Sequence, residues 1–352
     1  MCNPRALIAM SGGVDSSVAA YLTLQAGLDC IAATMQLHTA GNQSSNDVED
    51  ARTVARKLEI PFHVFDFSED FRRHVVNDFV RCYEQGLTPN PCITCNRHLK
   101  FHRLLHQALE LGCDFVVTGH YARIQTDPKT GRYLLYKAAD KTKDQSYFLC
   151  LLSQHQLKHT QFPLGTYTKE QAREIAQTQG FLNARKRDSQ DICFIPNGDF
   201  YDFMQRHTGK HYPEGDFLDL QGNPVGRHKG AAAYTLGQRK GLGIAMGEPV
   251  YVCGKDMATN TVTVGPNEAL FHKGLLANRW NWFPFAELTK PLRVWAKARS
   301  RMVEQPAWVY PLENGDAQVV FDELQRAITP GQAVVLYDGD LVIGGGIITE
   351  VL

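Results

Sequence analysis

The chain has 352 residues, of which 43% are hydrophobic and 21% charged, so it is long enough for about two or three domains with substantial cores. Lys and Arg together number 37, as do Asp and Glu, and this balance excludes a bulk attraction for nucleic acid. Without an apolar stretch of about 18 residues, or room for a secretory signal before the first motif, we expect a cytoplasmic protein that does not meet a membrane. Nine cysteines scattered over the chain indicate mostly buried, reduced thiols.

The first motif is a Gly-rich turn between a predicted strand and a predicted helix. Residues 6–10 are apolar and strand-like, residues 11–17 read SGGVDSS, and a helix follows from residue 18 to Gly27. The glycines let backbone N–H groups approach an anion, and serine hydroxyls add donors at the positive end of the helix. No Lys follows, which argues against a Walker A loop. The motif therefore predicts a phosphate site, against the alternative of an ordinary Ser/Gly turn.

The next residues alternate between predicted strands and helices. Strands are expected at residues 30–37, 62–67 and 114–118, and helices at residues 48–58, 69–85 and 101–111. This order predicts an α/β fold with a doubly wound parallel sheet, whose ligands bind beyond the carboxyl ends of the strands. The Gly-rich turn, Met35 and the pair Gly119 and His120 should therefore converge, with Met35 either beside an adenine or in the core.

The composition changes at about residue 200. Helical periodicity disappears, and glycines become frequent in residues 226–243. From residue 292, short strands alternate with turn signals such as residues 313–316 and Asp338-Gly339, which is typical of a small antiparallel barrel. We therefore predict three domains: a nucleotide-binding catalytic domain (1–200), a small central connector (201–275) and a C-terminal antiparallel β-barrel (276–352).

A Cys-x-x-Cys pair, Cys92 and Cys95, lies in a segment with two prolines that we expect to be a loop between two helices. The spacing alone fits half a zinc site, a redox or nucleophilic pair, or ligands of an iron–sulfur cluster. No second pair with good spacing completes a zinc site. Cys193 is the natural third thiol, because the cations of residues 185–187 can lower its pKa; the alternative is a buried cysteine beside a solvated basic run.

Several separated blocks together resemble the tRNA-specific 2-thiouridylases, a family of the ATP pyrophosphatase superfamily, over essentially the whole chain. The blocks are residues 11–17, 88–96, 118–123, 143–147, 188–194 and 234–243. The first block alone resembles the pyrophosphate loop of ATP pyrophosphatases in general. The resemblance implies an enzyme that adenylates the wobble uridine (position 34) of tRNAs for Lys, Glu and Gln and replaces its C2 oxygen by sulfur.

The resemblance also implies roles for individual residues. Cys95 would be the nucleophile and Cys193 the carrier of a persulfide, with a disulfide between them left to be reduced. ATP would contact Ala9, Met10, Ser11, Gly12, Gly13, Val14, Asp15, Ser16, Met35 and Gly119. The tRNA would contact Asn90, Pro91, Cys92, His120, Lys143, Asp144, Gln145, Arg299, Ser300 and Gln332, the last three in the barrel. An external cysteine desulfurase or sulfur-relay protein would supply the sulfur.

One departure from the family concerns Cys92, where many members carry Asp. The extra thiol opens a second route, in which Cys92, Cys95 and Cys193 hold a [4Fe–4S] cluster that binds exogenous sulfide, as in cluster-dependent thiolases of tRNA. Three thiols are more than a two-thiol relay requires, which favours the cluster, although Cys92 can also be a passenger. Mg²⁺ is expected to share the pyrophosphate charge, and Asp15 either helps to hold it or caps the following helix.

Basic stretches distributed over the chain are candidate phosphate contacts for a tRNA whose uridine is flipped out. Each of them alone is equally well a solvated surface. They are Arg97 with Lys100, and residues 185–187, 227–229, 239–240 and 297–301.

Two other functions compete with thiolation. An amidating ligase of the same superfamily needs an ammonia source, and no glutaminase domain accompanies Cys2. A noncatalytic zinc-dependent RNA-binding protein would have no need of the intact phosphate motif.

Overall fold

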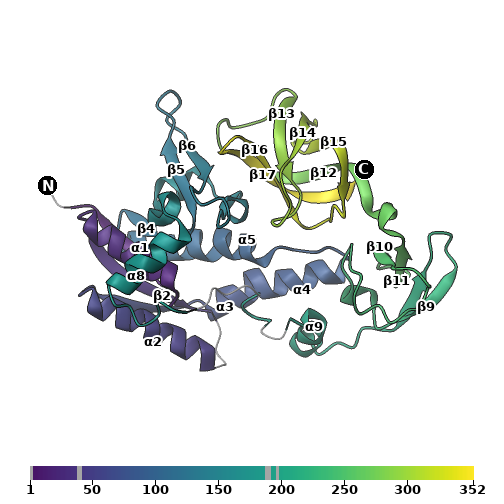
Figure 1. Cartoon of the computed structure of the whole chain (residues 1–352), viewed down its shortest axis with the longest axis horizontal. Coiled ribbons are helices and arrows are strands. Elements are labelled where there is room, and N and C mark those ends of the chain that lie inside the picture. Colours follow the sequence, from purple (N-terminus) through teal and green to yellow (C-terminus); the bar gives the residue numbers. More distant parts are fainter. Residues whose placement is uncertain (1–2, 38–41, 187–191, 196–197) are drawn as a thin grey trace.

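The computed structural model describes residues 3–37, 42–186, 192–195 and 198–352. Its strands form a parallel sheet in the N-terminal part, a smaller mixed sheet in the middle and an antiparallel barrel at the C-terminal end. Figure 1 shows the helix-covered N-terminal sheet at one end of the molecule, with the barrel and the middle sheet at the other. The predicted fold class is confirmed.

The N-terminal sheet is parallel throughout, with strand order β3-β2-β1-β4-β7. Its strands are β1 (Arg5–Ala9), β2 (Asp29–Gln36), β3 (Phe62–Asp66), β4 (Phe115–Val117) and β7 (Thr160–Gln161). The strand order reverses between β1 and β4, and the crevice beyond their carboxyl ends is where such sheets bind ligands. The segments that follow these two strands are therefore the first place to look for a site.

Helices cover both faces of this sheet (Figure 1). Ala6 and Ile8 of β1 pack into one core with α1 (Val14–Gln25), α2 (Asn42–Lys57) and α8 (Lys169–Thr178). Leu7, between them, points to the opposite face, as the two-residue period of a strand requires. The helical segments on that face are α3 (Ser68–Phe71), η1 (Arg72–Val76), α4 (Asn77–Glu84), α5 (Pro91–Cys95), η2 (Asn96–Arg103) and α6 (Leu104–Glu110).

The segment with two prolines is irregular only at residues 87–90, and the loop prediction was wrong from Pro91 onward, where both cysteines lie. Pro91 is the first residue of α5, where its missing N–H leaves no intrahelical bond unmade. Asn90 caps the helix, since its Oδ1 accepts a hydrogen bond from the N–H of Ile93 at 3.4 Å. Cys92 and Cys95 therefore project from a helix that continues as η2 and α6, which gives both thiols a fixed separation.

The middle sheet has the order β10-β11-β8-β9. Its strands are β8 (Gly215–Leu218), β9 (Pro224–His228), β10 (Tyr251–Asp256) and β11 (Thr261–Gly265). Helical structure does not end at residue 200, contrary to the prediction, because α9 (Phe200–Thr208) follows directly. Its N-cap is Asp199, whose carboxylate accepts the N–H groups of Tyr201 and Asp202 at 3.1 and 3.0 Å.

The C-terminal barrel is antiparallel and closed, because β12 pairs with both β15 and β17. Its strands are β12 (Phe271–Trp282), β13 (Leu292–Lys297), β14 (Gln305–Pro311), β15 (Ala317–Arg326), β16 (Ala333–Asp338) and β17 (Leu341–Val351). The predicted turn at residues 313–316 joins β14 to β15, and the turn at Asp338-Gly339 joins β16 to β17.

A hairpin that the sequence did not predict connects the N-terminal part to the barrel. It consists of β5 (Ala122–Thr126) and β6 (Tyr133–Lys137), and β6 pairs with β17 of the barrel. The remaining helical segments are η3 (Ser146–Leu149), α7 (Gln154–Lys158), η4 (Pro163–Thr166), η5 (Ala231–Ala233) and η6 (Asn267–Leu270). In the described part of the chain, no helix is long and apolar enough to cross a membrane.

Candidate active site

The Gly-rich turn follows β1, and α1 begins at Val14, four residues earlier than predicted. Gly12 has φ +71°, and a Cβ there would lie 2.4 Å from the carbonyl oxygen of Asp47, so only glycine fits. The hydroxyls of Ser16 and Ser17 both donate to the carbonyl oxygen of Gly13 at 3.0 Å. The serines thus brace the turn, while the unbonded N–H groups of the first helical turn remain the donors for an anion.

The segment after β4 meets this turn. A Cβ on Gly119 would lie 2.7 Å from both the carbonyl carbon of Asp15 and the nitrogen of Ser16, so glycine is needed for the two backbones to touch. At the end of β2, Thr34 donates to the carbonyl oxygen of Met10 at 2.8 Å, and the half-buried Met35 packs against the core. The ends of β1, β2 and β4 therefore lie together, as the order of the strands predicts.

Asp15 is neutralised by the protein itself. Lys169 Nζ lies 2.7 and 2.8 Å from the two carboxylate oxygens, and the Tyr121 hydroxyl donates to Oδ1 at 2.9 Å. The Lys169 side chain is only 8% exposed. With both oxygens occupied, Asp15 in this arrangement does not fit a Mg²⁺ ligand, and no step below passes through that ion.

Asn183, like Lys169, belongs to the site but was not predicted from the sequence. It is buried, and its Nδ2 donates to the carbonyl oxygen of Gly12 at 3.0 Å and to the Ser17 hydroxyl at 2.9 Å. Its Oδ1 is buried without a hydrogen-bond partner. A buried orphan acceptor is costly unless a ligand supplies a donor, so Asn183 belongs to the turn that we expect to hold ATP.

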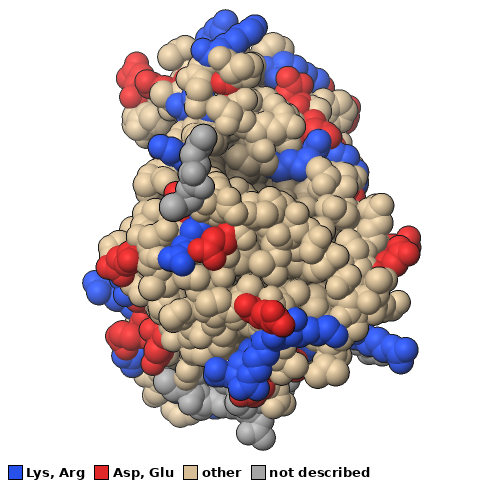
Figure 2. All heavy atoms as spheres, turned by 90° about the vertical axis from the view of Figure 1, so that its left-hand side faces the viewer, with Lys and Arg blue, Asp and Glu red and all other residues tan. Residues whose placement is uncertain are grey.

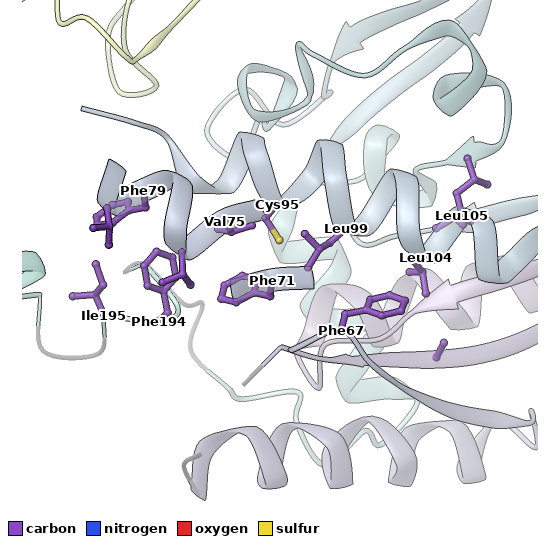
Figure 3. Close-up of a cluster of buried hydrophobic side chains, with 14 of the residues drawn as sticks. Phe67, Phe71, Val75, Phe79, Cys95, Leu99, Leu104, Leu105, Phe194 and Ile195 are labelled. Atoms are coloured by element: carbon purple, nitrogen blue, oxygen red, sulfur yellow. The ribbon is translucent and has the colours of Figure 1, made fainter. Parts of the chain in front are cut away.

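The cysteine site lies on the face of the sheet opposite α1. Cys95 is buried, and in Figure 3 its sulfur points in among Val75, Phe71 and Leu99. Cys92, three residues earlier on α5, is exposed. One thiol of the pair therefore faces solvent and the other faces the hydrophobic core.

Cys193 is held near α5 by the residue that follows it. Phe194 is buried and packs edge-on against Phe71 and Phe79 (Figure 3), with ring centroids 5.7 and 5.3 Å apart. Cys193 itself is exposed. Phe71 also belongs to the cluster around Cys95. Two thiols that are 98 positions apart in the chain are thereby anchored to one cluster.

The thiol pKa values are raised, which contradicts the prediction for Cys193. The Cys193 side chain reaches solvent, but crowding by the surrounding protein raises its pKa to about 12. The neighbouring thiols of Cys95 and Cys92 add to this increase. Burial raises the pKa of the Cys95 thiol. Crowding by the surrounding protein raises that of Cys92 as well, although its side chain reaches solvent. Lys100 is the cation that opposes the increase for all three thiols.

The described residues of the basic run before Cys193, Arg185 and Lys186, do not provide that cation. Lys186 is bound elsewhere, with Nζ at 2.6 Å from Asp47 and 2.7 Å from Asp50. Arg187 lies outside the described residues. For Arg185 and Lys186, the described residues of this run, the expected effect on the Cys193 thiol is therefore not found.

The described cysteines form neither of the two linkages predicted from the sequence, a disulfide or an iron–sulfur site. All eight cysteines that the structure describes are free thiols, so the predicted disulfide between Cys95 and Cys193 is not present. Among the described residues, no group of three or more His, Cys, Asp or Glu side chains is arranged to hold a metal ion. Because Cys95 faces the hydrophobic core, the three cysteines as placed do not fit an iron–sulfur cluster, and no step below passes through iron.

Gln332 reaches from the barrel to the segment before α5. Its Nε2 donates to the carbonyl oxygens of Thr88 and Pro89 at 2.8 and 3.3 Å, and the N–H of Thr88 donates to Pro330 at 2.9 Å. The predicted contact residues Asn90 and Pro91 follow immediately as cap and first residue of the helix. Gln332 therefore positions the cysteine helix in this structure.

The other predicted tRNA contacts are partly structural. His120 is buried with Nδ1 at 2.7 Å from the Thr118 hydroxyl, and burial holds its pKa well below the usual range. Gln145 accepts the N–H of Tyr121 at 2.9 Å. The Asp144 carboxylate accepts hydrogen bonds from residues 138 and 146. Lys143 is half-buried.

Arg299 joins the barrel to the middle part of the chain. Its guanidinium donates to the carbonyl oxygen of Leu236 at 3.0 Å and to the Thr329 hydroxyl, while Nε is buried without a partner. Burial lowers its pKa. The neighbouring Ser300 is half-buried. Arg299 therefore braces the barrel against the middle part of the chain.

Surface charge agrees with the zero net charge. On the face shown in Figure 2, Lys and Arg are interspersed with Asp and Glu around a broad uncharged area. No single-sign field covers this face, so attraction of a polyanion depends on local groups.

Three family models match successive parts of the chain. They are described as the tRNA methyl transferase HUP domain, the tRNA methyl transferase PRC-barrel domain and the aminomethyltransferase beta-barrel domain, and they match residues 4–197, 201–266 and 272–348. Together they account for nearly the whole chain.

The chain is similar over its length to curated proteins. It is 48% identical to a tRNA-specific 2-thiouridylase MnmA of Clostridioides difficile, covering 99% of each chain. It is 47% identical to the protein of the same name from Acetivibrio thermocellus, covering 99% of this chain and 100% of that one. A solved 4-thiouridine synthetase–RNA complex with bound ATP is 15% identical over 58% of this chain and 50% of that one, with a TM-score of 0.36. On the full-length similarity, the chain belongs to the family of tRNA-specific 2-thiouridylases.

Proposed function

We propose that this protein is an ATP-dependent tRNA 2-thiouridylase, which replaces the C2 oxygen of uridine 34 by sulfur in the tRNAs for Lys, Glu and Gln. The observation that carries the proposal is the anchoring of Cys95 and Cys193 to one cluster in the domain that also bears the phosphate turn. The domain limits 1–200, 201–275 and 276–352 are part of the proposal, and the residues matched by the three family models support them.

The first step activates an unreactive carbonyl. The uridine O2 attacks the α-phosphorus of ATP, the bond from that phosphorus to the bridging oxygen breaks, and pyrophosphate leaves as N3 loses its proton. The turn at residues 11–13 and the first N–H groups of α1 stabilise the departing pyrophosphate, and the position of this turn at the start of the helix supports that role. Asn183 and Lys169 hold that turn and Asp15 in position.

The second step exchanges oxygen for sulfur. The terminal sulfur of a Cys193 persulfide attacks C2, and AMP leaves with the former O2. The Cys95 thiolate then attacks Cys193 Sγ, the bond between that sulfur and the transferred sulfur breaks, and 2-thiouridine is released after it takes up a proton. A Cys95–Cys193 disulfide remains, and an external dithiol returns it to two thiols with two electrons. A cysteine desulfurase or relay protein reloads Cys193.

The raised thiol pKa values constrain this step. Only the thiolate is nucleophilic, and both cysteines are protonated at neutral pH in this structure. Lys100 is the group that favours the anion at each of them. A change that brings Lys100 nearer when tRNA binds would activate Cys95 at the moment when sulfur has to be released.

The proposal is tested with the purified protein, ATP, unmodified tRNA, cysteine and a cysteine desulfurase. Nucleoside analysis of the tRNA should show 2-thiouridine only when ATP is present. Cys92→Asp distinguishes the two sulfur routes, because it restores the commoner family residue and leaves Cys95 and Cys193 intact. Activity near that of the unchanged protein supports the persulfide route, whereas loss of activity together with protein-bound iron supports the cluster.

A further inference from the structure

A cavity of about 390 Å³ lies between η2 and barrel strand β12, away from the phosphate turn. Four of the described residues that line it carry basic side chains and none is acidic: Arg97, His98, His102 and Arg279. We propose that this cavity holds a phosphate of the tRNA backbone, with Arg97 and Arg279 as the groups that bind it. The inference rests on the proposed tRNA substrate. It joins Arg97, already a candidate phosphate contact from the sequence, to Arg279, which the sequence did not single out.

The two arginines are available for an external anion. Both are exposed, and in the described part of the chain neither has an Asp or Glu within salt-bridge distance. By contrast, Arg293 on the same barrel binds Asp322 at 2.6 Å. Arginine forms two parallel hydrogen bonds with a phosphate. Two arginines that face one cavity without carboxylate partners are therefore a suitable phosphate site.

The surroundings of the cavity are positively charged. After burial, the groups that lower the pKa of His98 are Arg97, His74 and His102. Asp78 raises the pKa of His98, but its carboxylate is already paired with Arg81. The local charge therefore favours an anion even though the whole chain is neutral.

The backbone directs Arg279 to this place. Arg279 has φ +52°, and the pairing of β12 with β17 shifts between Asn278 and Asn281, which is a bulge. Asn281 ties the bulge to the N-terminal domain by donating to the carbonyl oxygens of Cys150 and Leu152 at 2.9 and 3.0 Å. Bulges and left-handed non-glycine residues are concentrated at functional sites, where they redirect a side chain.

An aromatic wall favours a nucleotide over a bare inorganic anion. Trp280 lines the cavity and is fixed by stacking on Trp282, with ring centroids 4.7 Å apart, and by donating to the carbonyl oxygen of Ala277. Single-stranded RNA is bound by aromatic rings next to arginines that hold its phosphates. Arg97 also follows Cys95 by two residues, roughly 3 Å along the helix axis. A phosphate held here would therefore fix the RNA relative to the cysteine helix.

The test compares Arg97→Gln, Arg279→Gln and the double variant with Arg293→Gln as a matched barrel control. The dissociation constant of unmodified tRNA is measured at several salt concentrations. Each single variant should bind about 3- to 10-fold more weakly, and the slope of log Kd against log salt should fall by about 0.7 to 0.9 for each lost phosphate contact. Arg97→Lys and Arg279→Lys should retain most of the affinity, and the KM for ATP should not change.

Three outcomes would overturn the inference: unchanged affinity and salt slope in the double variant, an equal loss in Arg293→Gln, or weaker binding of AMP or inorganic phosphate with unchanged tRNA binding. Failure of the proposed function can be distinguished from failure of this inference, because in that case the unchanged protein would not thiolate tRNA. The binding measurement requires neither ATP nor a sulfur donor.

Discussion

At the scale of single residues, the ion pair between Lys169 and Asp15 is the contact that sequence reasoning could not supply. The two residues are 154 positions apart, and no local pattern distinguishes Lys169 from other lysines. Asn183 is likewise 171 positions from Gly12. The phosphate turn and the cysteines could be predicted because each is a local motif, whereas the groups that orient them are brought in only by the packing of the chain.

Replacing Lys169 by Met should impair adenylation. The variant leaves the partly buried Asp15 carboxylate without its cation, and removing one partner of a buried pair costs about 3–5 kcal/mol, less here because Asp15 is 31% exposed. We expect the rate of ATP–pyrophosphate exchange on bound tRNA to fall at least about tenfold. Lys169→Arg should restore much of it. Exchange at the original rate in Lys169→Met would show that the ion pair has no part in the reaction.

The raised pKa of Cys193 predicts the pH dependence of its modification. A thiol with a pKa of about 12 has a thiolate fraction that rises about tenfold per pH unit between pH 7 and 9. Alkylation of Cys193, followed by peptide mass spectrometry, should therefore accelerate throughout this range. A plateau near the ordinary thiol pKa of about 8.5 would contradict the structure. The same shift stabilises the fold below that ordinary pKa, and this contribution is lost as the pH rises towards the folded value.

At the scale of elements, α5 shows why the proline-rich segment was misinterpreted. Two prolines near each other usually indicate a loop, but Pro91 is at the one helical position where proline is favoured, directly after the cap Asn90. The start of the helix could therefore have been predicted from Asn90-Pro91. Its continuation to residue 110 could not, because the hydrophobic periodicity before residue 101 is weak. The parallel sheet was predictable because its apolar strands alternate with amphipathic helices.

The segment that carries Cys193 depends on Phe194. Phe194→Ala removes the ring that packs on Phe71 and Phe79, at a cost of about 3–5 kcal/mol if the cavity does not collapse. We expect sulfur transfer to be lost while ATP–pyrophosphate exchange is retained, because the phosphate turn lies elsewhere. Phe194→Leu, which refills most of the space, should recover transfer. Full 2-thiouridine formation by a folded Phe194→Ala protein would refute this role.

At the scale of the whole molecule, the N-terminal part and the barrel share one core. Tyr147 and Leu149 pack with Phe283 and Tyr337 of the barrel, and the Tyr147 hydroxyl donates to the carbonyl oxygen of Ala333 at 2.8 Å. The sequence could separate the three units by composition but could not show this shared core, because it forms between residues nearly 200 positions apart.

The shared core predicts that damage to the barrel spreads to the catalytic domain. Phe283→Ala empties a fully buried position and should destabilise the fold by about 3–5 kcal/mol. Hydrogen exchange should then accelerate in residues 146–152 as well as in β12. Faster exchange confined to the barrel would show that the two parts open independently.

The central claim is that sulfur passes from Cys193 to the tRNA with the help of Cys95. The most direct measurement loads the protein with radioactive sulfur from labelled cysteine and a desulfurase, removes the donor, and adds ATP and unmodified tRNA for one turnover. The account predicts that the label moves from the Cys193 peptide to free tRNA in the unchanged protein. In Cys95→Ser the label should stay bound to the protein, and Cys193→Ser should transfer none. Release of labelled tRNA by either variant at the original rate would contradict the account.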